Sequence, residues 1–467
     1  MPDYKLLING ELVDGDSTMD VVNPATEEVL AKCPRGSLAQ LNAAVAAAKA
    51  AFPAWSRRPI GERRAMILDL ADKIEARQNE FARLLTQEQG KPLTESTAEI
   101  AYTSAFIRHL ASYDLPVKVI EDSANRLVEQ HRLPLGVVGA IIPWNFPVLI
   151  TAFKAPLALL AGNTVVIKPA PTTPLTTLRL GEIMAGIFPA GVVNIVTDLN
   201  DLGAQLSAHP DVAKISFTGS TATGQKVMAS AAGTIKRLTL ELGGNDAAIV
   251  LPGADPQKVA PGIFGGAFMN AGQVCLAIKR AYIHESIYDE VVAILAKLAG
   301  EAVVDDGLRQ GTTIGPVQNK MQFEKLKGFL ADARSDGRIV AGGEVEDRPG
   351  YFIRPTIVAD IDDSSRLVSE EQFGPILPVV KYSDPEDALA RANASPWGLG
   401  GSVWGPDRDA TRKIALRMET GTAWINKHLD FGPNMPFGGA KQSGIGVEFA
   451  EEGLAEFTQL HIVNEAR

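Results

Sequence analysis

The stretch Val137-Val138-Gly139-Ala140-Ile141-Ile142 is a continuous apolar run that ends at a proline, Pro143. A short apolar run bounded in this way is typical of a strand that is buried on both faces. Similar short runs recur between helical stretches at residues 164–168, 192–196, 214–217 and 247–251. This alternation predicts an α/β fold in which these strands form one doubly wound sheet.

The segment that follows, Pro143-Trp144-Asn145-Phe146-Pro147, sets one polar side chain between two prolines. Because proline fixes the backbone, this turn should hold the Asn145 amide in one orientation. A rigid N–H donor is what an oxyanion formed during a reaction needs. Asn145 is therefore a candidate for oxyanion stabilisation.

The chain has two cysteines, and one lies in Asn270-Ala271-Gly272-Gln273-Val274-Cys275-Leu276-Ala277-Ile278-Lys279-Arg280. A thiol attacks as its thiolate, and a turn that opens a helix beside a basic pair should lower the thiol pKa below about 8.5. Cys275 is therefore the candidate nucleophile. A buried structural thiol is the common alternative for a cysteine, and we assign that role to Cys33.

A lone carboxylate stands among apolar residues in Leu240-Glu241-Leu242-Gly243-Gly244-Asn245. A carboxylate in such surroundings resists ionisation, so Glu241 is suited to act as a general base near neutral pH. The presence of this candidate base favours the catalytic interpretation of Cys275 over the structural one.

Taken together, and in the chain order Asn145, Glu241, Cys275, the three stretches resemble the aldehyde dehydrogenase superfamily. The resemblance covers nearly the whole chain, and it includes further matching strings: Asn23-Pro24-Ala25-Thr26, Phe217-Thr218-Gly219-Ser220-Thr221, Glu371-Gln372-Phe373-Gly374-Pro375, Pro436-Phe437-Gly438-Gly439 and Lys441-Gln442-Ser443-Gly444. A co-linear set of this size is much more specific than any one of the strings.

The resemblance implies an NAD(P)-dependent oxidation of an aldehyde to a carboxylic acid. Cys275 would add to the carbonyl, and the Asn145 amide with the Cys275 backbone N–H would hold the oxyanion. After hydride transfer to NAD or NADP, Glu241 would activate the water that hydrolyses the thioester. Glu448 matches a second acid that some members place near this pair, and a surface acid is the equal alternative.

The resemblance also implies three parts of the chain. Residues 1–115 and 135–248 would form a Rossmann-type NAD(P)-binding domain, and residues 249–445 an α/β catalytic domain. Residues 116–134 and 446–467 would form a small β arm for assembly into a homodimer or homotetramer. Within the first part, we expect the alanine-rich helix at residues 43–51 to be broken by Pro53.

The dinucleotide fingerprint Gly-x-Gly-x-x-Gly follows none of the predicted strands. The turn at residues 217–224 is a substitute, because it leads into a helix whose N-terminal amides can face a pyrophosphate. An ordinary Ser/Thr helix cap is the alternative. The cofactor contacts that the resemblance implies are Ile142, Pro143, Trp144, Lys168, Gly203, Gly219, Ser220, Gly224, Leu242, Glu371 and Phe373.

The choice between NAD and NADP depends on one departure from the family pattern. Many NAD-preferring members carry a glutamate three residues after the lysine that bonds the adenine ribose. Here Lys168 is followed by Pro169-Ala170-Pro171. Proline removes the repulsion that a glutamate would exert on a 2′-phosphate, so we expect the chain to accept both cofactors.

Composition limits the possible partners. The net charge is −10 without a long basic run, which argues against nucleic acid or an anionic membrane as a partner. The sequence has no apolar span of membrane length and no basic-then-apolar N-terminal segment, so we expect a cytoplasmic protein. Two cysteines and six histidines without paired spacing predict no metal site.

The substrate is the least defined element. Apolar residues surround the motifs and no arginine adjoins the asparagine, so an uncharged aldehyde is favoured over one with a carboxylate. Lys427 and His428, in a loop expected to close the mouth of the site, keep a semialdehyde substrate as the alternative. A CoA-acylating enzyme is less favoured because such relatives often lack the glutamate. A non-catalytic member would lack the three motifs, whereas redox sensing by Cys275 is compatible with activity.

Overall fold

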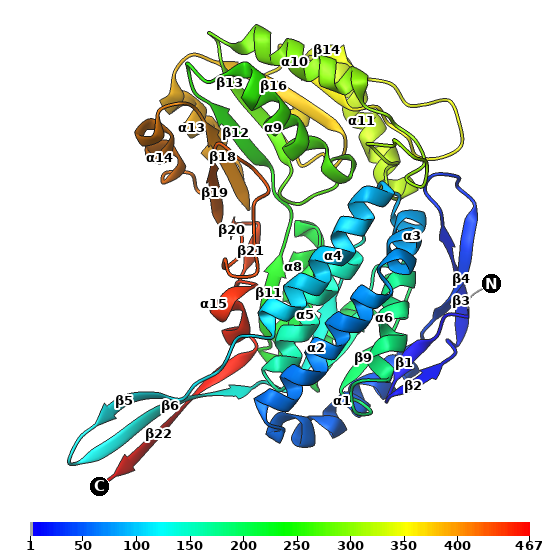
Figure 1. Ribbon diagram of the computed structural model, residues 1–467, viewed down its shortest axis with the longest axis vertical. Helices are drawn as coiled ribbons and strands as arrows, with labels where there is room; N and C mark the ends of the chain where they lie inside the picture. The colour runs from blue at the N-terminus through cyan, green and yellow to red at the C-terminus, as the bar shows by residue number, and fades with distance from the viewer. Residues whose placement is uncertain (1–2) are drawn as a thin grey trace.

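The computed structural model describes residues 3–467, which form two large sheets and a separate three-stranded sheet (Figure 1). The first sheet has the strand order β2-β1-β9-β8-β7-β10-β11-β21. Its strands are β1 (Leu6–Ile8), β2 (Glu11–Val13), β7 (Val137–Ile141), β8 (Thr164–Lys168), β9 (Val193–Ile195), β10 (Val212–Thr218), β11 (Arg237–Glu241) and β21 (Gly444–Ile445). The strands from β9 to β11 run parallel, while β1 and β21 pair antiparallel at either side.

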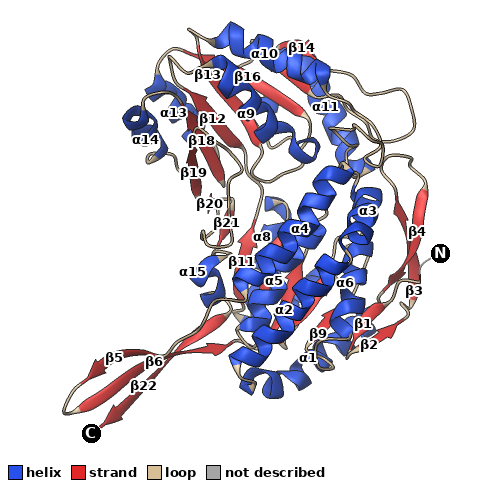
Figure 2. Ribbon diagram, in the orientation of Figure 1, coloured by secondary structure: helices blue, strands red, loops and turns tan. Residues whose placement is uncertain are grey.

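Helices cover both faces of this sheet (Figure 2). On one face, Val138 and Ala140 of β7 pack in a core with α5 (Pro147–Leu160) and α6 (Leu175–Ala185), and α2 (Ile60–Ala76), α3 (Gln78–Gln89) and α4 (Leu93–Leu110) pack outside them. On the other, Val137 and Ile141 pack in a core with α1 (Leu38–Arg57), α7 (Gly203–Ala208) and α8 (Thr221–Ala231). The alternation of strand residues between two apolar cores explains the continuous apolar runs in the sequence.

The strand predicted at residues 247–251 belongs to the other sheet. It is β12 (Asp246–Val250), which pairs with β13 and β18 and not with any strand of the first sheet. The strand beside β10 is β11 instead. The predicted boundary between the two domains, at residues 248/249, therefore falls inside β12. The chain passes from the first sheet to the second between β11 and β12. The prediction was wrong because β12 is as apolar as the strands of the first sheet, whereas β11 carries Arg237, Thr239 and Glu241, and local sequence does not specify which strand is the neighbour.

The second sheet has the order β14-β15-β16-β13-β12-β18-β19. Its strands are β12, β13 (Ile278–His284), β14 (Arg338–Ala341), β15 (Thr356–Ala359), β16 (Ile376–Tyr382), β18 (Gly400–Trp404) and β19 (Thr422–Ile425). One core joins it to α9 (Pro256–Phe268) and α10 (Tyr288–Glu301), and another to α11 (Lys320–Asp336), α13 (Pro385–Asn393) and α14 (Arg408–Ala415). The chain then returns to the first sheet, where β21 pairs with β11.

Each large sheet with its covering helices forms one unit, and the third sheet projects away from these two units (Figure 1). It consists of β5 (Lys118–Asp122), β6 (Arg126–Pro134) and β22 (Thr458–Ala466), and β22 follows the short helix α15 (Ala450–Ala455). β6 lies in the middle and pairs antiparallel with both neighbours. The expected pairing of the 116–134 segment with the C-terminal strand is thus present. Several of its apolar side chains are exposed, including Val119, Ile120 and Ile462.

The N-terminal region contains a hairpin of β3 (Ser17–Val22) and β4 (Val29–Arg35), followed by α1. The expected break at Pro53 does not occur, because α1 continues to Arg57. Trp55 is buried against the core of the first unit and anchors the last turn, and such packing outweighs the missing hydrogen bond of an exposed proline. Among residues 3–467, no helix combines the length and apolar character that crossing a membrane requires.

Candidate active site

The predicted site residues of the first sheet gather at its carboxyl edge. The chain order reverses between β7 and β10, which lie side by side, and such a reversal is where doubly wound sheets bind ligands. Ile142 N–H donates to the Lys168 carbonyl (2.9 Å), and Gly219 N–H donates to the Glu241 carbonyl (3.0 Å). The sheet therefore brings the ends of β7, β8, β10 and β11 to one line.

Asn145 is buried in the loop between β7 and α5, whose first residue is Pro147. Its side-chain Nδ2 donates to the Gln273 carbonyl (3.1 Å), which lies two residues before Cys275. Its own carbonyl accepts from Lys91 Nζ (2.9 Å) and Asn270 Nδ2 (3.1 Å). The amide is therefore held by the loop of residues 273–277, here called the nucleophile loop, as well as by the prolines. One Nδ2 hydrogen remains for a ligand.

Cys275 lies in a loop between the 3₁₀ helix Met269–Gly272 and β13. The expectation that its turn opens an α-helix is wrong. Asn270, Ala271 and Gly272 all have left-handed backbone (φ 50°, 54° and 72°), and this run makes the turn. A side chain at Gly272 would collide with the Gly374 carbonyl, so glycine allows the nucleophile loop to contact the loop that contains Glu371 and Phe373.

The electrostatic expectation for the thiol is also wrong. Burial raises the pKa of Cys275 to about 12, although the charge of Lys279 opposes this shift. Lys279 Nζ donates to the Cys275 carbonyl (2.6 Å) and to the Val274 carbonyl (3.0 Å). The lysine thus fixes the backbone on which the thiol is carried. The sequence places this cation near the thiol, but desolvation is the larger effect.

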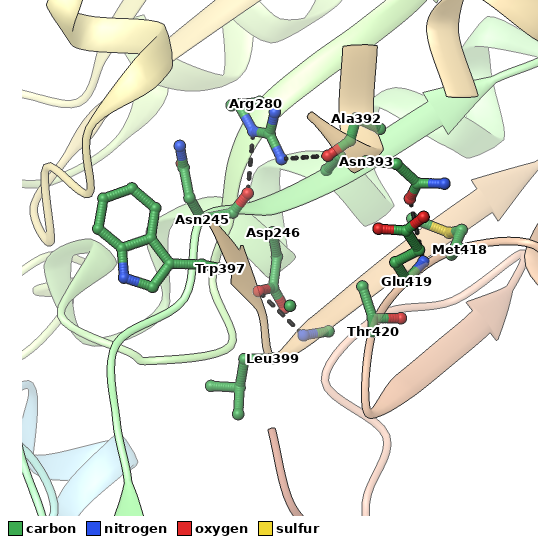
Figure 3. A pocket seen from close by; sticks show the side chains of 13 residues that line it. Asn245, Asp246, Arg280, Ala392, Asn393, Trp397, Leu399, Met418, Glu419 and Thr420 are labelled. Carbon is green, nitrogen blue, oxygen red and sulfur yellow. Dashed lines mark hydrogen bonds between the residues drawn. The ribbon is translucent and has the colours of Figure 1, made fainter. Parts of the chain in front are cut away.

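The other cation of the basic pair points elsewhere. Figure 3 shows the Arg280 guanidinium bonded to the carbonyls of Asn245 (2.9 Å) and Ala392 (3.1 Å). In the same small pocket, Asp246 accepts from Gly400 N–H (3.1 Å), and burial raises the pKa of this carboxyl to about 7. Arg280 therefore supports the second sheet, and Lys279 is the member of the pair beside the thiol.

Glu241 ends β11 and is 4% exposed. Within the described residues, neither carboxylate oxygen has a hydrogen-bond partner. Burial raises the pKa of Glu241 well above its ordinary range; the charge of Glu448 raises it further and that of Lys154 lowers it. The predicted resistance to ionisation is confirmed.

Lys154 and Glu448 form a buried ion pair behind Glu241. Glu448 is 3% exposed, so the alternative of a surface acid is wrong. Lys154 Nζ also donates to Ser216 Oγ (3.0 Å) on β10. Sequence reasoning missed Lys154, although it is the single charged residue in the buried helix α5, and that pattern is a usable signal.

The loop after α12 (Arg366–Ser369) reaches the same region. Glu371 Oε1 accepts from Gly244 N–H (3.0 Å), and a side chain at Gly243 would collide with the Glu371 carboxylate. Phe373 packs edge-on against Trp144, with ring centroids 5.4 Å apart. Gly243 is thus explained by the close approach of Glu371, and Gly244 by that of Asp246 Oδ1 and the Cys275 carbonyl.

The turn between β10 and α8 contains the predicted phosphate-side residues. Ser220 caps α8 by accepting from Thr223 N–H (3.3 Å), as the ordinary capping alternative expects. A side chain at Gly224 would collide with Leu242, so glycine lets α8 pack on the segment after Glu241. The cap is compatible with an anion site, since the helix N-terminus lies at the carboxyl edge of the sheet.

Lys168 ends β8, and its Nζ lies 2.6 Å from Asp198 Oδ1. Gly203 begins α7 beside it, and a side chain there would meet the Lys168 Cε at 3.3 Å. Sequence reasoning missed Asp198. An acid just beyond a strand end of the sheet was the signal that could have identified it.

Cys275 is half-buried against the large apolar core of the first sheet. Cys275, Phe146, Leu429 and Phe431 pack against the same core cluster. Around it, contacts between neighbouring rings link Phe106, Phe153, Phe431, Phe437 and Phe449.

Lys427 and His428, on which the alternative of a semialdehyde substrate depended, both bond to other groups of the chain. Lys427 forms an ion pair with Asp430. The buried His428 ring lies with Nε2 2.6 Å from the Leu276 carbonyl, and burial lowers the pKa of His428 to about 3. Neither side chain therefore presents a positive charge to a substrate in this structure.

Comparison with known proteins identifies the family. The model of the aldehyde dehydrogenase family matches residues 12–463. A phenylacetaldehyde dehydrogenase from Pseudomonas fluorescens is 40% identical over 97% of this chain and 94% of its own. The succinate-semialdehyde dehydrogenase (NADP(+)) GabD of Escherichia coli (strain K12) is 36% identical over 97% of this chain and 96% of its own.

A solved NAD+ complex of aldehyde dehydrogenase from Bacillus cereus superposes with a TM-score of 0.97 at 36% identity, covering 100% of this chain and 97% of its own. The chain therefore belongs to the aldehyde dehydrogenase family and is an oxidoreductase of that class. The family and the fold that the sequence predicted are both confirmed.

Proposed function

We propose that the chain oxidises an aldehyde to a carboxylic acid through a thioester on Cys275. The observation that carries this proposal is the contact of Asn145 Nδ2 with the Gln273 carbonyl (3.1 Å), which joins the oxyanion candidate to the nucleophile loop. The thiol adds to the carbonyl carbon, and the Asn145 amide donates its remaining hydrogen to the oxygen that becomes negative. The Cys275 backbone N–H is the second donor.

Glu241 is the general base of this reaction. Its raised pKa and its unpaired oxygens fit a carboxylate that takes a proton from water and releases it. Water attacks the thioester carbon, the C–S bond breaks, the acid leaves the site, and Cys275 is restored as the free thiol. The charge of Lys154 favours the ionised form of Glu241, whereas burial and the charge of Glu448 favour the protonated form, so Glu241 can both take and return the proton.

NAD or NADP accepts the hydride when it is bound. The residues that would hold it lie along the carboxyl edge: Ile142, Pro143, Trp144, Lys168, Gly203, Gly219, Ser220, Gly224 and Leu242, with Glu371 and Phe373 from the second unit. Two features of the chain fit such a group: the N-terminus of α8 at the edge, and the paired rings of Trp144 and Phe373.

The substrate is an uncharged aryl or alkyl aldehyde. The linked aromatic rings contact or belong to the same core cluster against which Cys275 packs, and they supply apolar surface. The positive charges of the closing loop, by contrast, are paired or buried. A terminal carboxylate would therefore lose hydration without gaining an ion pair. Phenylacetaldehyde and succinic semialdehyde are the two substrates that separate this proposal from its alternative.

The exposed apolar side chains of the projecting sheet favour a homodimer or homotetramer in which copies pair through this arm. We also propose a cytoplasmic location, from the acidic composition.

The test is formation of NADH or NADPH with both aldehydes, with and without CoA. Cys275→Ala should lose activity by more than about a hundredfold, the range for removing a covalent nucleophile. Cys33→Ala, which changes the other cysteine of the chain, is the matched control and should keep the wild-type rate. Undiminished turnover in Cys275→Ala would refute the mechanism, and turnover that requires CoA would assign an acylating enzyme.

A further inference from the structure

The pair Lys168–Asp198 is buried at the carboxyl edge of the first sheet. Lys168 Nζ lies 2.6 Å from Asp198 Oδ1, and the Asp198 side chain is 0% exposed. The other carboxylate oxygen accepts from Leu202 N–H (2.8 Å), in the residue that precedes α7. Two contacts therefore fix the carboxylate in its place beside the amine.

The position of the pair relates it to the adenosine end of a dinucleotide. β8 and β9 lie on the same side of the reversal between β7 and β10. In doubly wound sheets that bind NAD, an acid at this edge bonds the ribose 2′-hydroxyl, whereas a nearby arginine accommodates the 2′-phosphate of NADP. This step rests on the proposed function, in which Lys168 meets the adenine ribose.

The charges of this corner are already balanced. The charge of Lys168 is compensated by Asp198, and Arg35 forms an ion pair with Asp201 (2.9 Å) three residues further on. A phosphate that approaches Lys168 would therefore meet a buried carboxylate at close range, where water screens the repulsion weakly. A ribose hydroxyl can instead donate to the same carboxylate.

We propose that Asp198 makes this chain select NAD over NADP. It would take the part of the glutamate that is missing at Pro171, but from a different strand end. The sequence predicted that the chain accepts both NAD and NADP, from the residues directly after Lys168. The residues after β9, which include Asp198, favour NAD instead. A merely structural ion pair would hold the loop without distinguishing the two cofactors.

The test uses adenosine fragments, so that it needs no turnover. Isothermal titration should show 5′-AMP binding to the wild-type protein at least about tenfold more tightly than adenosine 2′,5′-bisphosphate, the scale of a close like-charge contact. Asp198→Asn should improve binding of the bisphosphate about tenfold and change binding of 5′-AMP by less than about threefold, because only the former carries the 2′-phosphate.

Asp201→Asn is the matched control, since it removes an exposed acid from the same loop. It should change the ratio of the two affinities by less than about threefold, because an exposed charge is screened. Equal gains in both variants would overturn the assignment to Asp198, as would a wild-type protein that binds the two nucleotides equally. If Asp198→Asn does not fold, as judged by thermal melting, the wild-type ratio still decides. Failure of both nucleotides to bind would overturn the cofactor site itself and this inference with it.

Discussion

Replacing Lys154 by methionine removes the cation that stands between two buried acids. Its Nζ forms an ion pair with Glu448 and donates to Ser216 Oγ (3.0 Å), while Glu448 and Glu241 are 3% and 4% exposed. Methionine keeps the length of the side chain but not its charge. The change therefore tests the electrostatic role of Lys154 with little change in packing.

The expected loss of stability follows from the burial of the pair. Breaking a buried ion pair on one side costs about 3–5 kcal/mol, because the remaining charge is left without compensation. With an unfolding entropy of about 2 cal/mol/K per residue, 467 residues that unfold together give about 1 kcal/mol/K. Lys154→Met should therefore lower Tm by about 3–5 °C.

The same change should alter the pH dependence of hydrolysis. The charge of Lys154 lowers the pKa of Glu241 against burial and Glu448, so its removal raises that pKa further. At a pH below this pKa, each unit of increase reduces the ionised base, and with it the rate, about tenfold. The rising limb of the pH profile should move to higher pH.

Calorimetry and single-turnover kinetics on the wild-type protein and two variants test the role of Lys154. Lys154→Met/Glu448→Gln replaces the ion pair by neutral groups, so it should recover most of the lost Tm, because no buried charge is left unpaired. An unchanged Tm and an unchanged pH profile in Lys154→Met would refute the role of Lys154. A double variant as unstable as the single one would show that Glu448 is not the charge left uncompensated.

Four further outcomes are expected. Glu241→Gln should give a burst of about one equivalent of NADH per site and then a slow steady rate, because hydride transfer precedes hydrolysis; a slow trace without a burst would move Glu241 to the first step. Burial raises the pKa of Glu88 to about 7, so the folded chain holds a proton that the unfolded chain loses, and the free energy of unfolding falls as pH rises from about 4 to 7. In chemical denaturation, Glu88→Gln should remove up to about 3 kcal/mol of this fall. Wild-type and Glu88→Gln plots of unfolding free energy against pH that run parallel would contradict this. Light scattering should give at least twice the mass of 49.7 kDa, since the arm cannot cover its own apolar residues. Pro171→Glu should move the ratio of kcat/KM further toward NAD, whereas an unchanged ratio would mean that residue 171 does not face the ribose.

The parts of the site that the sequence predicted depend on backbone chemistry. Prolines on both sides of Asn145 and the glycines at Gly219 and Gly243 restrict or permit particular conformations, and these act over a few residues. The strand ends that carry Asn145, Lys168 and Glu241 could therefore be located. Their meeting at one edge follows from the doubly wound order, which the alternation of strands and helices indicates.

The parts that could not be predicted depend on contacts between distant segments. The apolar run of β12 is equally suited to either sheet, and its neighbours are 30 or more residues away in β13 and β18. The prediction of a lowered thiol pKa was wrong for the same reason. The segments that bury Cys275 are distant in the sequence, and the desolvation that they cause raises the pKa more than nearby Lys279 lowers it. Glu448 stayed ambiguous until Lys154, 294 residues away, was found beside it.

Three buried lysines around the site each form an ion pair with an acid, and this bears on how the reaction begins. Lys91 pairs with Glu99, Lys154 with Glu448, and Lys168 with Asp198, so each of these three charges has its own counter-charge. Cys275 and Glu241 are different: burial raises the pKa of both groups and so disfavours a negative charge on either of them. A thiolate must nevertheless form before attack, and its proton must leave a site that stabilises neither negative charge strongly. The rate of the first step should therefore increase with pH until one of the two groups ionises, and the positive charge that an oxidised nicotinamide brings when bound would favour that ionisation at Cys275.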